Sequence, residues 1–246
     1  MNTYHIHIGG LVQGVGFRPF ICRLAERMGI PGWVSNGNDG VHIEINATEE
    51  EADSFYQSIL CCQPANAIIR SHHLKKISSR GFREFTIKES DNSAQPDLLL
   101  TPDIAICETC RKEITDPENK RYQYPFTTCL ECGPRYSIIT GLPYDRPNTT
   151  MADIPICHSC EAEYADIHNH RHYSQTNSCP DCAINMHLFD NNGVEISKDA
   201  ESILLIATES LRHGHILAVK GIGGYLLLCD ATKHYSVTTL RDRKHR

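Results

Sequence analysis

The sequence contains no apolar run close to the length of about 18 residues that a membrane-spanning helix needs. Residues 1–5 carry neither the basic stretch nor the apolar stretch that begins a secretory signal, so we expect none. Positive charge is not in excess either, because 24 Lys and Arg stand against 30 Asp and Glu, a formal net charge of −6. Nucleic-acid binding therefore cannot be argued from charge. These absences favour a cytoplasmic protein without a membrane segment.

The length of 246 residues is enough for two or three domains. A hydrophobic fraction of 40% supports folded cores and excludes a disordered or fibrous protein. Residues 1–90, 97–187 and 198–246 differ in their patterns, and a polar stretch that ends in Pro96 separates the first two. We therefore predict three segments with different architectures.

Residues 1–90 show the alternation and spacing of a small domain with both strands and helices. The expected elements are strands at 4–8, 33–35, 41–45, 68–69 and 82–88, and helices at 18–28 and 49–60. With the runs at 68–69 and 82–88 together supplying its end, their order is β-α-β-β-α-β, which is typical of the ferredoxin-like fold, in which two crossover units share one antiparallel sheet. The sequence therefore predicts an α+β fold for this segment.

Residues 97–187 contain a duplication with a period of 50 residues. The run Asp-Ile-Ala-Ile-Cys at 103–107 returns as Asp-Ile-Pro-Ile-Cys at 153–157. The match extends to four further pairs of positions: Glu113 and Glu163, Asp116 and Asp166, Asn119 and Asn169, Arg121 and Arg171. Few apolar periodic runs occur here, so the two copies, at about 103–135 and 153–185, cannot bury enough apolar surface to fold alone. We therefore expect a bound metal ion to stabilise them.

Eight of the twelve cysteines form four Cys-x-x-Cys pairs: Cys107 and Cys110, Cys129 and Cys132, Cys157 and Cys160, Cys179 and Cys182. In a chain without an export signal this pattern indicates metal binding rather than disulfides. Four thiolates complete a tetrahedral Zn²⁺ site, so the pairs predict two structural zinc sites with no open position. One site per copy is favoured. Joining the first pair to the fourth and the second to the third also fits the spacing, and redox dithiols or an iron–sulfur cluster are rival interpretations.

The other cysteines and one group of histidines have simpler interpretations. Four cysteines lie in apolar or helical contexts and are expected to be inert: Cys22, Cys61, Cys62 and Cys229. A further cluster is suggested by His168, His170 and His172, but we expect these side chains to be solvated on the surface.

A loop with two glycines connects the first expected strand to the first expected helix. In Gln-Gly-Val-Gly-Phe-Arg at 13–18, the glycines let backbone N–H groups converge, and the helix N-terminus adds partial positive charge. Arg18 can then hold a phosphoryl group with two hydrogen bonds. Asn36 follows at the end of the next strand, where it either orients a water molecule for in-line attack or simply forms a turn. The Lys-Ser or Lys-Thr ending of a Walker A loop is absent.

The third segment, residues 198–246, predicts one helix and two buried strands. Apolar residues on one face indicate the helix at 199–213, and apolar runs at 216–219 and 225–229 indicate the strands. So few elements make a poor independent core, and we interpret the segment as the truncated start of an α/β domain. The closing basic run at 241–246 is typical of a solvated helix face.

The first segment resembles acylphosphatases. The resemblance rests on Gly-Leu-Val-Gln-Gly-Val-Gly-Phe-Arg-Pro-Phe at 10–20 and on Gly-Trp-Val-Ser-Asn-Gly-Asn-Asp-Gly-Val at 32–41. It implies that Arg18 binds the phosphate and that Asn36 positions the attacking water. Four loop amides would complete the anion site and stabilise charge on the phosphoryl oxygens: those of Gly14, Val15, Gly16 and Phe17.

The whole chain resembles one family, HypF, the carbamoyltransferases that mature nickel–iron hydrogenases. The resemblance rests on the order of the acylphosphatase loop, the four Cys-x-x-Cys pairs and Lys-Gly-Ile-Gly-Gly-Tyr at 220–225. Further matching motifs are Tyr-Pro-Phe at 124–126, Cys-Gly-Pro-Arg at 132–135, Leu-Pro-Tyr-Asp-Arg-Pro at 142–147, Cys-Asp-Ala at 229–231 and Leu-Arg-Asp-Arg-Lys-His-Arg at 240–246. The last run is similar to the start of the nucleotide-binding part of a YrdC-like domain.

The HypF resemblance implies a relay of reactions. Carbamoyl phosphate is cleaved at the acylphosphatase domain, and the carbamate is adenylated with ATP in the YrdC-like domain. A further domain passes the carbamoyl group to the C-terminal cysteine of the partner HypE, where it is dehydrated to cyanide. Lys220, Lys244 and Arg246 are the candidate contacts for ATP or carbamoyl adenylate, and RNA binding is expected only through the YrdC-like part, if at all.

The chain departs from the family pattern at one position. HypF proteins usually carry a histidine six residues before the seventh cysteine of the set, and Tyr173 stands there in this chain, next to His172. The departure argues against a metal-binding or interdomain role for a histidine at that position. The final transferase domain of the family has no counterpart in the sequence.

A different class of function also fits the cysteines: a non-enzymatic, zinc-organised binding module. It would resemble the cysteine-rich region of DnaJ chaperones or a zinc ribbon that binds RNA. This interpretation leaves the loop at 13–18 unexplained, and a basic stripe with interleaved aromatic residues is absent. We therefore favour an enzyme that hydrolyses carbamoyl phosphate or another acyl phosphate.

Overall fold

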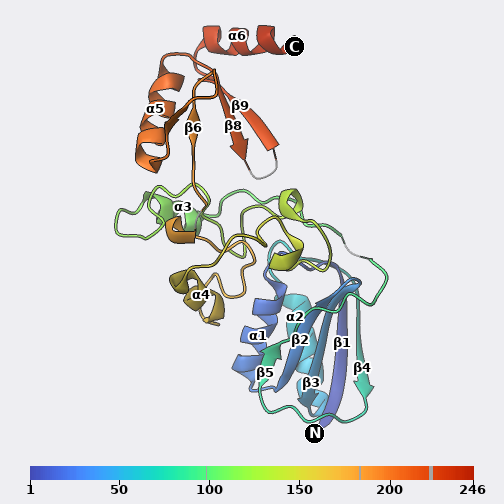
Figure 1. Cartoon of the computed structure of the whole chain (residues 1–246). Coiled ribbons are helices and arrows are strands. Elements are labelled where there is room, and N and C mark those ends of the chain that lie inside the picture. The colour runs from blue at the N-terminus through green and yellow to red at the C-terminus, as the bar shows by residue number, and fades with distance from the viewer. Residues whose placement is uncertain (98, 183, 222–223) are drawn as a thin grey trace. The chain divides into compact units, whose positions relative to one another are not determined.

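The structure, a computed structural model, describes residues 1–97, 99–182, 184–221 and 224–246 (Figure 1). It divides into two units, residues 1–182 and residues 183–246. The first unit contains the α+β domain and both copies of the duplicated segment. Within the described ranges, no helix is long and apolar enough to cross a membrane.

Five strands of the first unit form one sheet, in the order β4-β1-β3-β2-β5. The elements are, in chain order, β1 (Asn2–Leu11), α1 (Phe17–Met28), β2 (Gly32–Gly37), β3 (Gly40–Ala47), α2 (Glu49–Cys61), β4 (Ile68–Ile77) and β5 (Phe85–Ile87). This order confirms the ferredoxin-like fold predicted from the sequence. One pairing differs from a wholly antiparallel sheet, because the short β5 runs parallel to β2.

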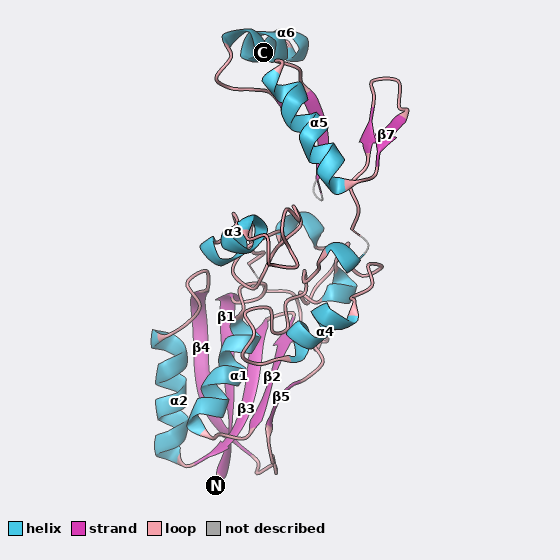
Figure 2. Ribbon diagram, turned by 90° about the vertical axis from the view of Figure 1, so that its left-hand side faces the viewer, coloured by secondary structure: helices cyan, strands magenta, loops and turns pink. Residues whose placement is uncertain are grey.

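Both helices cover the same face of this sheet (Figure 2). Along β1, successive side chains alternate between the helix-covered face and the other face of the sheet. Ile6 and Ile8 are fully buried in the core with Phe55 of α2, whereas His5 and His7 are half-buried on the other face. Burial of each large apolar side chain contributes on the order of 2 kcal/mol. The core of the α+β domain is therefore built without any of the paired cysteines.

Glycines determine where α1 begins and ends. Gly16 precedes the helix with a φ of 78°, and Gly29 closes it with a φ of 64°. Gly14, earlier in the same loop, has a φ of 70°. These left-handed conformations disfavour residues with a Cβ atom, so glycine is preferred at these three positions.

The duplicated segment contains only short elements. Helices α3 (Glu108–Thr115) and α4 (His158–Ala165) occupy equivalent places in the two copies, and each begins directly after a cysteine. Three single 3-10 turns accompany them: η1 (Tyr136–Ile138), η2 (Arg146–Asn148) and η3 (Pro180–Cys182). The buried clusters of the duplicated segment consist mainly of cysteines. This agrees with the expectation that a bound metal ion stabilises the segment.

The second unit contains β6 (Leu188–Phe189), β7 (Glu195–Ser197), α5 (Ala200–Arg212), β8 (Leu217–Gly221), β9 (Gly224–Leu228) and α6 (His234–Lys244). The predicted helix and both predicted strands are present, and β8 pairs antiparallel with β9. The expectation of buried strands is wrong, because Tyr225 and Leu226 are 73% and 62% exposed. Two strands are too few to bury the faces of a sheet. Residues 222 and 223 of the Lys-Gly-Ile-Gly-Gly-Tyr motif lie outside the described residues.

Candidate active site and metal centres

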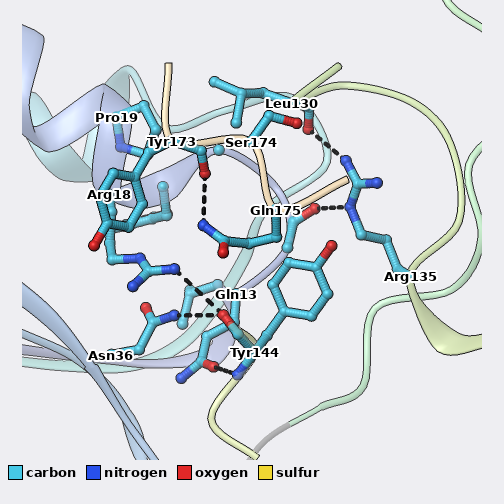
Figure 3. Close-up of a pocket in the computed structure, with 14 residues that line it drawn as sticks. Gln13, Arg18, Pro19, Asn36, Leu130, Arg135, Tyr144, Tyr173, Ser174 and Gln175 are labelled. Atoms are coloured by element: carbon cyan, nitrogen blue, oxygen red, sulfur yellow. Dashed lines mark hydrogen bonds between the residues drawn. The ribbon is translucent and has the colours of Figure 1, made fainter. Parts of the chain in front are cut away.

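A small cavity lies at the loop between β1 and α1 (Figure 3). Its volume is about 30 Å³, which is room for roughly two water molecules. Side chains of the α+β domain and of the duplicated segment line it together: Gln13, Phe17, Arg18 and Asn36 with Leu130, Arg135, Tyr144, Tyr173, Ser174 and Gln175. The predicted anion-binding loop is therefore covered by the duplicated segment of the same unit.

The loop itself has unpaired backbone donors. Among the described residues, no backbone carbonyl accepts a hydrogen bond from the N–H groups of residues 14–17. No side chain caps the N-terminus of α1, which begins at Phe17. Free N–H groups at a helix N-terminus attract an anion through hydrogen bonding and through the partial positive charge of the helix.

The Arg18 guanidinium is 6% exposed and forms a close ion pair. Its Nη2 donates to Asp145 Oδ1 at 2.7 Å and to the Tyr144 carbonyl at 3.3 Å. The hydroxyl of Ser90 hydrogen-bonds both Arg18 and Asp145, and the Tyr173 ring lies 4.8 Å from the guanidinium carbon. A carboxylate of the duplicated segment thus balances the charge of Arg18.

Asn36 lies within β2 and is only 2% exposed. Its Nδ2 donates to the same Tyr144 carbonyl that Arg18 contacts, at 3.3 Å (Figure 3). Its Oδ1 is buried and has no hydrogen-bond partner among the described residues. A buried amide oxygen without a partner, beside a cavity of this size, is a place for an ordered water molecule.

Two side chains hold the covering segment against the loop. Gln13 Oε1 accepts from the Tyr144 N–H at 2.9 Å, and Gln13 Nε2 donates to two carbonyls of the β2–β3 turn at 2.7 and 3.0 Å. Arg135 donates to the Gly14 carbonyl in the loop and, at 2.9 Å, to the Cys129 carbonyl. Hydrogen bonds therefore connect the loop with the first group of cysteines.

The structure brings Gly14, Gly16, Phe17, Arg18 and Asn36 to one cavity, whereas Val15, predicted with them, is not among the residues that line it. The chemical roles of all six residues stay predictions. The sequence did not identify Tyr144 and Asp145 as neighbours of Arg18. Both belong to the Leu-Pro-Tyr-Asp-Arg-Pro motif, which carried the family resemblance without an assigned role. Nothing local in that motif indicates contact with a loop more than a hundred residues earlier in the chain.

The paired cysteines form two groups of four in sequence order: Cys107, Cys110, Cys129 and Cys132, then Cys157, Cys160, Cys179 and Cys182. Neighbouring sulfur atoms lie 3.6 and 3.8 Å apart in the first group and 3.5 and 4.0 Å apart in the second. A zinc ion with Zn–S bonds of about 2.3 Å requires S–S edges of about 3.8 Å. Both groups fit tetrahedral zinc, and the grouping follows the sequential pairing rather than the interleaved one.

Two buried arginines cross between the copies. Arg121 of the first copy donates to Glu163 of the second at 2.6 and 2.9 Å and approaches a cysteine sulfur there at 3.6 Å. Arg171 of the second copy makes the same contacts with Glu113 and a cysteine sulfur of the first. Four thiolates around one Zn²⁺ leave a net negative charge, which an adjacent guanidinium offsets. The positions that match in the duplication therefore lock the two copies together.

The three clustered histidines differ from one another. His168 and His170 are exposed, as expected, with 73% and 40% of their side chains accessible. His172 is buried, so the expectation of a solvated side chain is wrong for it. Burial lowers the pKa of His172, and its Nδ1 has no hydrogen-bond partner among the described residues. Its neighbour Tyr173 faces Arg18 instead of a metal group.

The unpaired cysteines fall into two kinds. Cys22 is buried in the core, and burial raises the pKa of its thiol to about 12, which agrees with an inert side chain. Cys61 ends α2 and Cys62 follows it, which agrees with the helical context expected for them, and both are exposed with their sulfur atoms 3.1 Å apart.

The candidate nucleotide contacts lie in the second unit. Lys220 is in β8, Lys244 is the last residue of α6, and Arg246 follows it. All three side chains are exposed. Their assignment stays a prediction.

Family models match four stretches of the chain. The acylphosphatase model matches residues 4–87, the HypF finger model matches 106–139 and 156–189, and a model described as telomere recombination, for Sua5, YciO and YrdC proteins, matches 209–246. The first match covers the domain that contributes Arg18 and Asn36, and the two finger matches each contain one group of four cysteines. Fold and sequence together define an acylphosphatase-type domain joined to two Cys₄ fingers and the start of a YrdC-like region.

Whole-chain comparisons specify the family further. The chain is 46% identical over its full length to carbamoyltransferase HypF of Synechocystis sp., and 45% identical over 97% of its length to probable carbamoyltransferase HypF of Methanocaldococcus jannaschii. It matches a crystal structure of full-length HypF in the phosphate- and nucleotide-bound form with a TM-score of 0.90 and 34% identity, over all of this chain and 32% of that one. The chain belongs to the HypF carbamoyltransferase family and corresponds to its N-terminal part. It spans about a third of the length of the relatives it matches.

Proposed function

We propose that the acylphosphatase-type domain, residues 1–90, hydrolyses an acyl phosphate and that carbamoyl phosphate is its substrate. One observation carries the proposal: a guanidinium, loop residues whose N–H groups have no partner among the described residues, and an amide oxygen that likewise has none meet at one small cavity with room for water. Phosphoryl transfer is accelerated mainly by positioning and by electrostatic stabilisation. These groups supply both.

Each group has a distinct task in the proposed reaction. Arg18 donates two hydrogen bonds to the phosphoryl oxygens, and the N–H groups of residues 14–17 stabilise the charge that develops on them. Asn36 Oδ1 accepts a hydrogen bond from the attacking water. The water oxygen forms a bond to phosphorus while the bond from phosphorus to the carbamate oxygen breaks. One proton of the water stays on the phosphate and the other passes to solvent, so the products are inorganic phosphate, carbamate and a proton. No covalent enzyme intermediate is needed.

Asp145 sets a condition for binding. Its carboxylate holds Arg18 at 2.7 Å, so the phosphate of a substrate must displace it or share the guanidinium with it. The cavity of about 30 Å³ has room for about two water molecules, so it must widen to admit any acyl phosphate, and a small carbamoyl group requires less widening than an aromatic acyl group. Both features support a compact, doubly charged substrate.

Two zinc ions are the metals that we propose for this chain. The cysteine groups provide four thiolates each, so zinc there stabilises the fingers and has no open position for a substrate. The similarity to HypF supports a wider reaction in the complete protein: ATP converts carbamate to carbamoyl adenylate, and the carbamoyl group passes to the C-terminal cysteine of HypE on the route to cyanide. Lys220, Lys244 and Arg246 are the candidate nucleotide contacts in residues 198–246, and the nucleotide in the related HypF structure supports ATP as the cofactor.

Phosphate release from carbamoyl phosphate tests the proposal. Arg18→Ala should lower kcat/KM by roughly a hundredfold or more, and Asn36→Ala should lower kcat with a smaller effect on KM. The matched control is Arg27→Ala, which removes an exposed arginine from the same helix. Release that is the same in Arg18→Ala and in the control would remove Arg18 from the mechanism.

A further inference from the structure

Three histidines form a row across the sheet face that the helices leave open. His7 of β1 lies directly opposite His42 of β3 and, on its other side, opposite His73 of β4. The His7 ring centroid is 4.7 Å from that of His42 and 5.1 Å from that of His73. The neighbouring His5 stacks on His42 with a centroid distance of 5.3 Å.

A carboxylate from the β2–β3 turn completes this group. His42 Nε2 is 2.9 Å from Asp39 Oδ1, and His7 Nε2 is 3.4 Å from Asp39 Oδ2. One atom from each of the three residues lies within 4.8 Å of the others. The side chains are 14% exposed for His7, 24% for His42 and 32% for Asp39, so the group is ordered by its surroundings yet reachable from solvent.

These distances match the edges of a metal coordination polyhedron. With metal–nitrogen and metal–oxygen bonds of 2.0–2.1 Å, neighbouring ligand atoms lie about 2.9 Å apart in an octahedron and about 3.3 Å apart in a tetrahedron. The observed 2.9 Å, to Asp39 Oδ1, is close to the octahedral edge, and the observed 3.4 Å, to Asp39 Oδ2, is close to the tetrahedral one, so a small adjustment of the carboxylate fits either geometry. His42 Nε2 hydrogen-bonds the Asp39 carboxylate, whereas His7 Nε2 hydrogen-bonds the Asp39 backbone carbonyl at 3.2 Å and lies slightly farther from the carboxylate. An ion can therefore replace the proton at His42, and the His7 ring must turn slightly from the carbonyl to join it.

The surroundings also orient one of the imidazoles. His42 Nδ1 is 3.1 Å from His5 Nε2, and this hydrogen bond directs His42 Nε2 toward Asp39. Such an outer contact is what fixes the ring of a metal-bound histidine. The nearby cation Arg80 is paired with Glu44 at 2.9 Å, so its charge is already balanced.

We propose that His7 Nε2, His42 Nε2 and the Asp39 carboxylate bind one divalent late first-row transition ion, at a site separate from the two cysteine groups. Two imidazoles and one carboxylate suit Ni²⁺, Cu²⁺ and Zn²⁺, whereas Ca²⁺ and Mg²⁺ require mainly oxygen ligands. Three protein ligands leave positions for water or for His73. The site is thus of an open, exchangeable kind, and it does not depend on the proposed hydrolase activity.

Calorimetric titration with Ni²⁺ tests the site on the whole, zinc-loaded chain without an affinity tag. The exposed thiols of Cys61 and Cys62 are also potential nickel ligands, so the titration uses a background with both changed to serine. We expect one Ni²⁺ per chain, and we expect His42→Gln and Asp39→Asn each to weaken binding at least tenfold. The matched control is His72→Gln on β4, whose side chain hydrogen-bonds Tyr56 and not the row.

X-ray absorption at the nickel edge supplies a readout that does not depend on stability. It should show nitrogen and oxygen neighbours with imidazole scattering, while the zinc content stays unchanged. Sulfur neighbours, equal binding by His42→Gln and His72→Gln, or no binding at micromolar nickel would each overturn the proposal. The row would then be a hydrogen-bonded stack of side chains only.

Discussion

The charge of Arg18 is neutralised before any substrate arrives, and this distinguishes the site from an open anion pocket. Its partner Asp145 is 20% exposed and comes from the duplicated segment. An ion pair of this kind keeps a buried guanidinium from being left without a counter-charge. In the proposed reaction it also makes a carboxylate the competitor of the phosphoryl group.

Changing Asp145 to Asn should therefore strengthen the binding of inorganic phosphate. The amide keeps the shape of the side chain but removes the negative charge, so we expect the inhibition constant of phosphate to fall by roughly tenfold. The control is Asp153→Asn at an exposed position of the duplicated segment. If phosphate bound more weakly to Asp145→Asn than to the parent chain, the carboxylate would be a positioning group for Arg18 rather than a competitor.

At this scale the sequence identified only one wall of the cavity. The loop at 13–18 and Asn36 could be proposed because each lies in a short motif, and the structure places all of them except Val15 at the cavity, while their roles stay predictions. Asp145 and Tyr173 were not, since a long-range contact leaves no local periodicity. Their contribution depends on how the fingers pack against α1, which the sequence of either segment alone does not determine.

The duplication explains how two short helices without an apolar stripe can hold together. Because the copies match at their glutamates and arginines, each helix presents a carboxylate to the arginine of the other copy. The sequence revealed the matching positions but not their crossed pairing, because a repeat can also pair within its own copy. The crossed pairs Arg121–Glu163 and Arg171–Glu113 join the two copies, neither of which has a large core of its own, into one module.

The Glu163 carboxyl predicts how this module responds to acid. Burial alone would raise its pKa, but hydrogen bonds from Arg121 and Lys120 lower the pKa from 4.5 to about 2. The stability this contributes is present above pH 4.5 and is lost as the pH falls from 4.5 toward 2, because the unfolded chain takes up the proton first. It amounts to on the order of 3 kcal/mol at neutral pH.

Urea unfolding of Glu163→Gln beside the parent chain, from pH 7 to pH 3 with excess zinc, measures this contribution. The difference in unfolding free energy should be largest at pH 7 and should shrink below pH 4.5. Glu161→Gln, at an exposed position of the same helix, should show no such difference. A difference that is constant with pH would mean that Glu163 acts through packing and not through charge.

On the scale of the molecule, the first 182 residues form one unit although their sequence predicts two unlike segments. The fold class and the two cysteine groups were predictable, because alternation and Cys-x-x-Cys spacing are local. The cavity that the two segments share was not predictable from the sequence. The exposure of β9 was not predictable either, because an apolar run does not reveal whether another layer of the structure covers the strand. The domain limits at 1–90, 97–187 and 198–246 stay proposals.

If the fingers form part of the cavity wall, removing zinc should change which substrates the site accepts. The core of the α+β domain contains none of the zinc-type cysteines, so its circular dichroism should persist after chelation while Tyr144, Arg135 and Leu130 lose their fixed places. We expect kcat/KM for benzoyl phosphate to rise several-fold relative to carbamoyl phosphate, because the cavity no longer limits the acyl group. Added zinc should restore the original ratio, and Arg18→Ala should abolish hydrolysis of both substrates. An unchanged ratio in fully zinc-free protein would show that the fingers do not control substrate size.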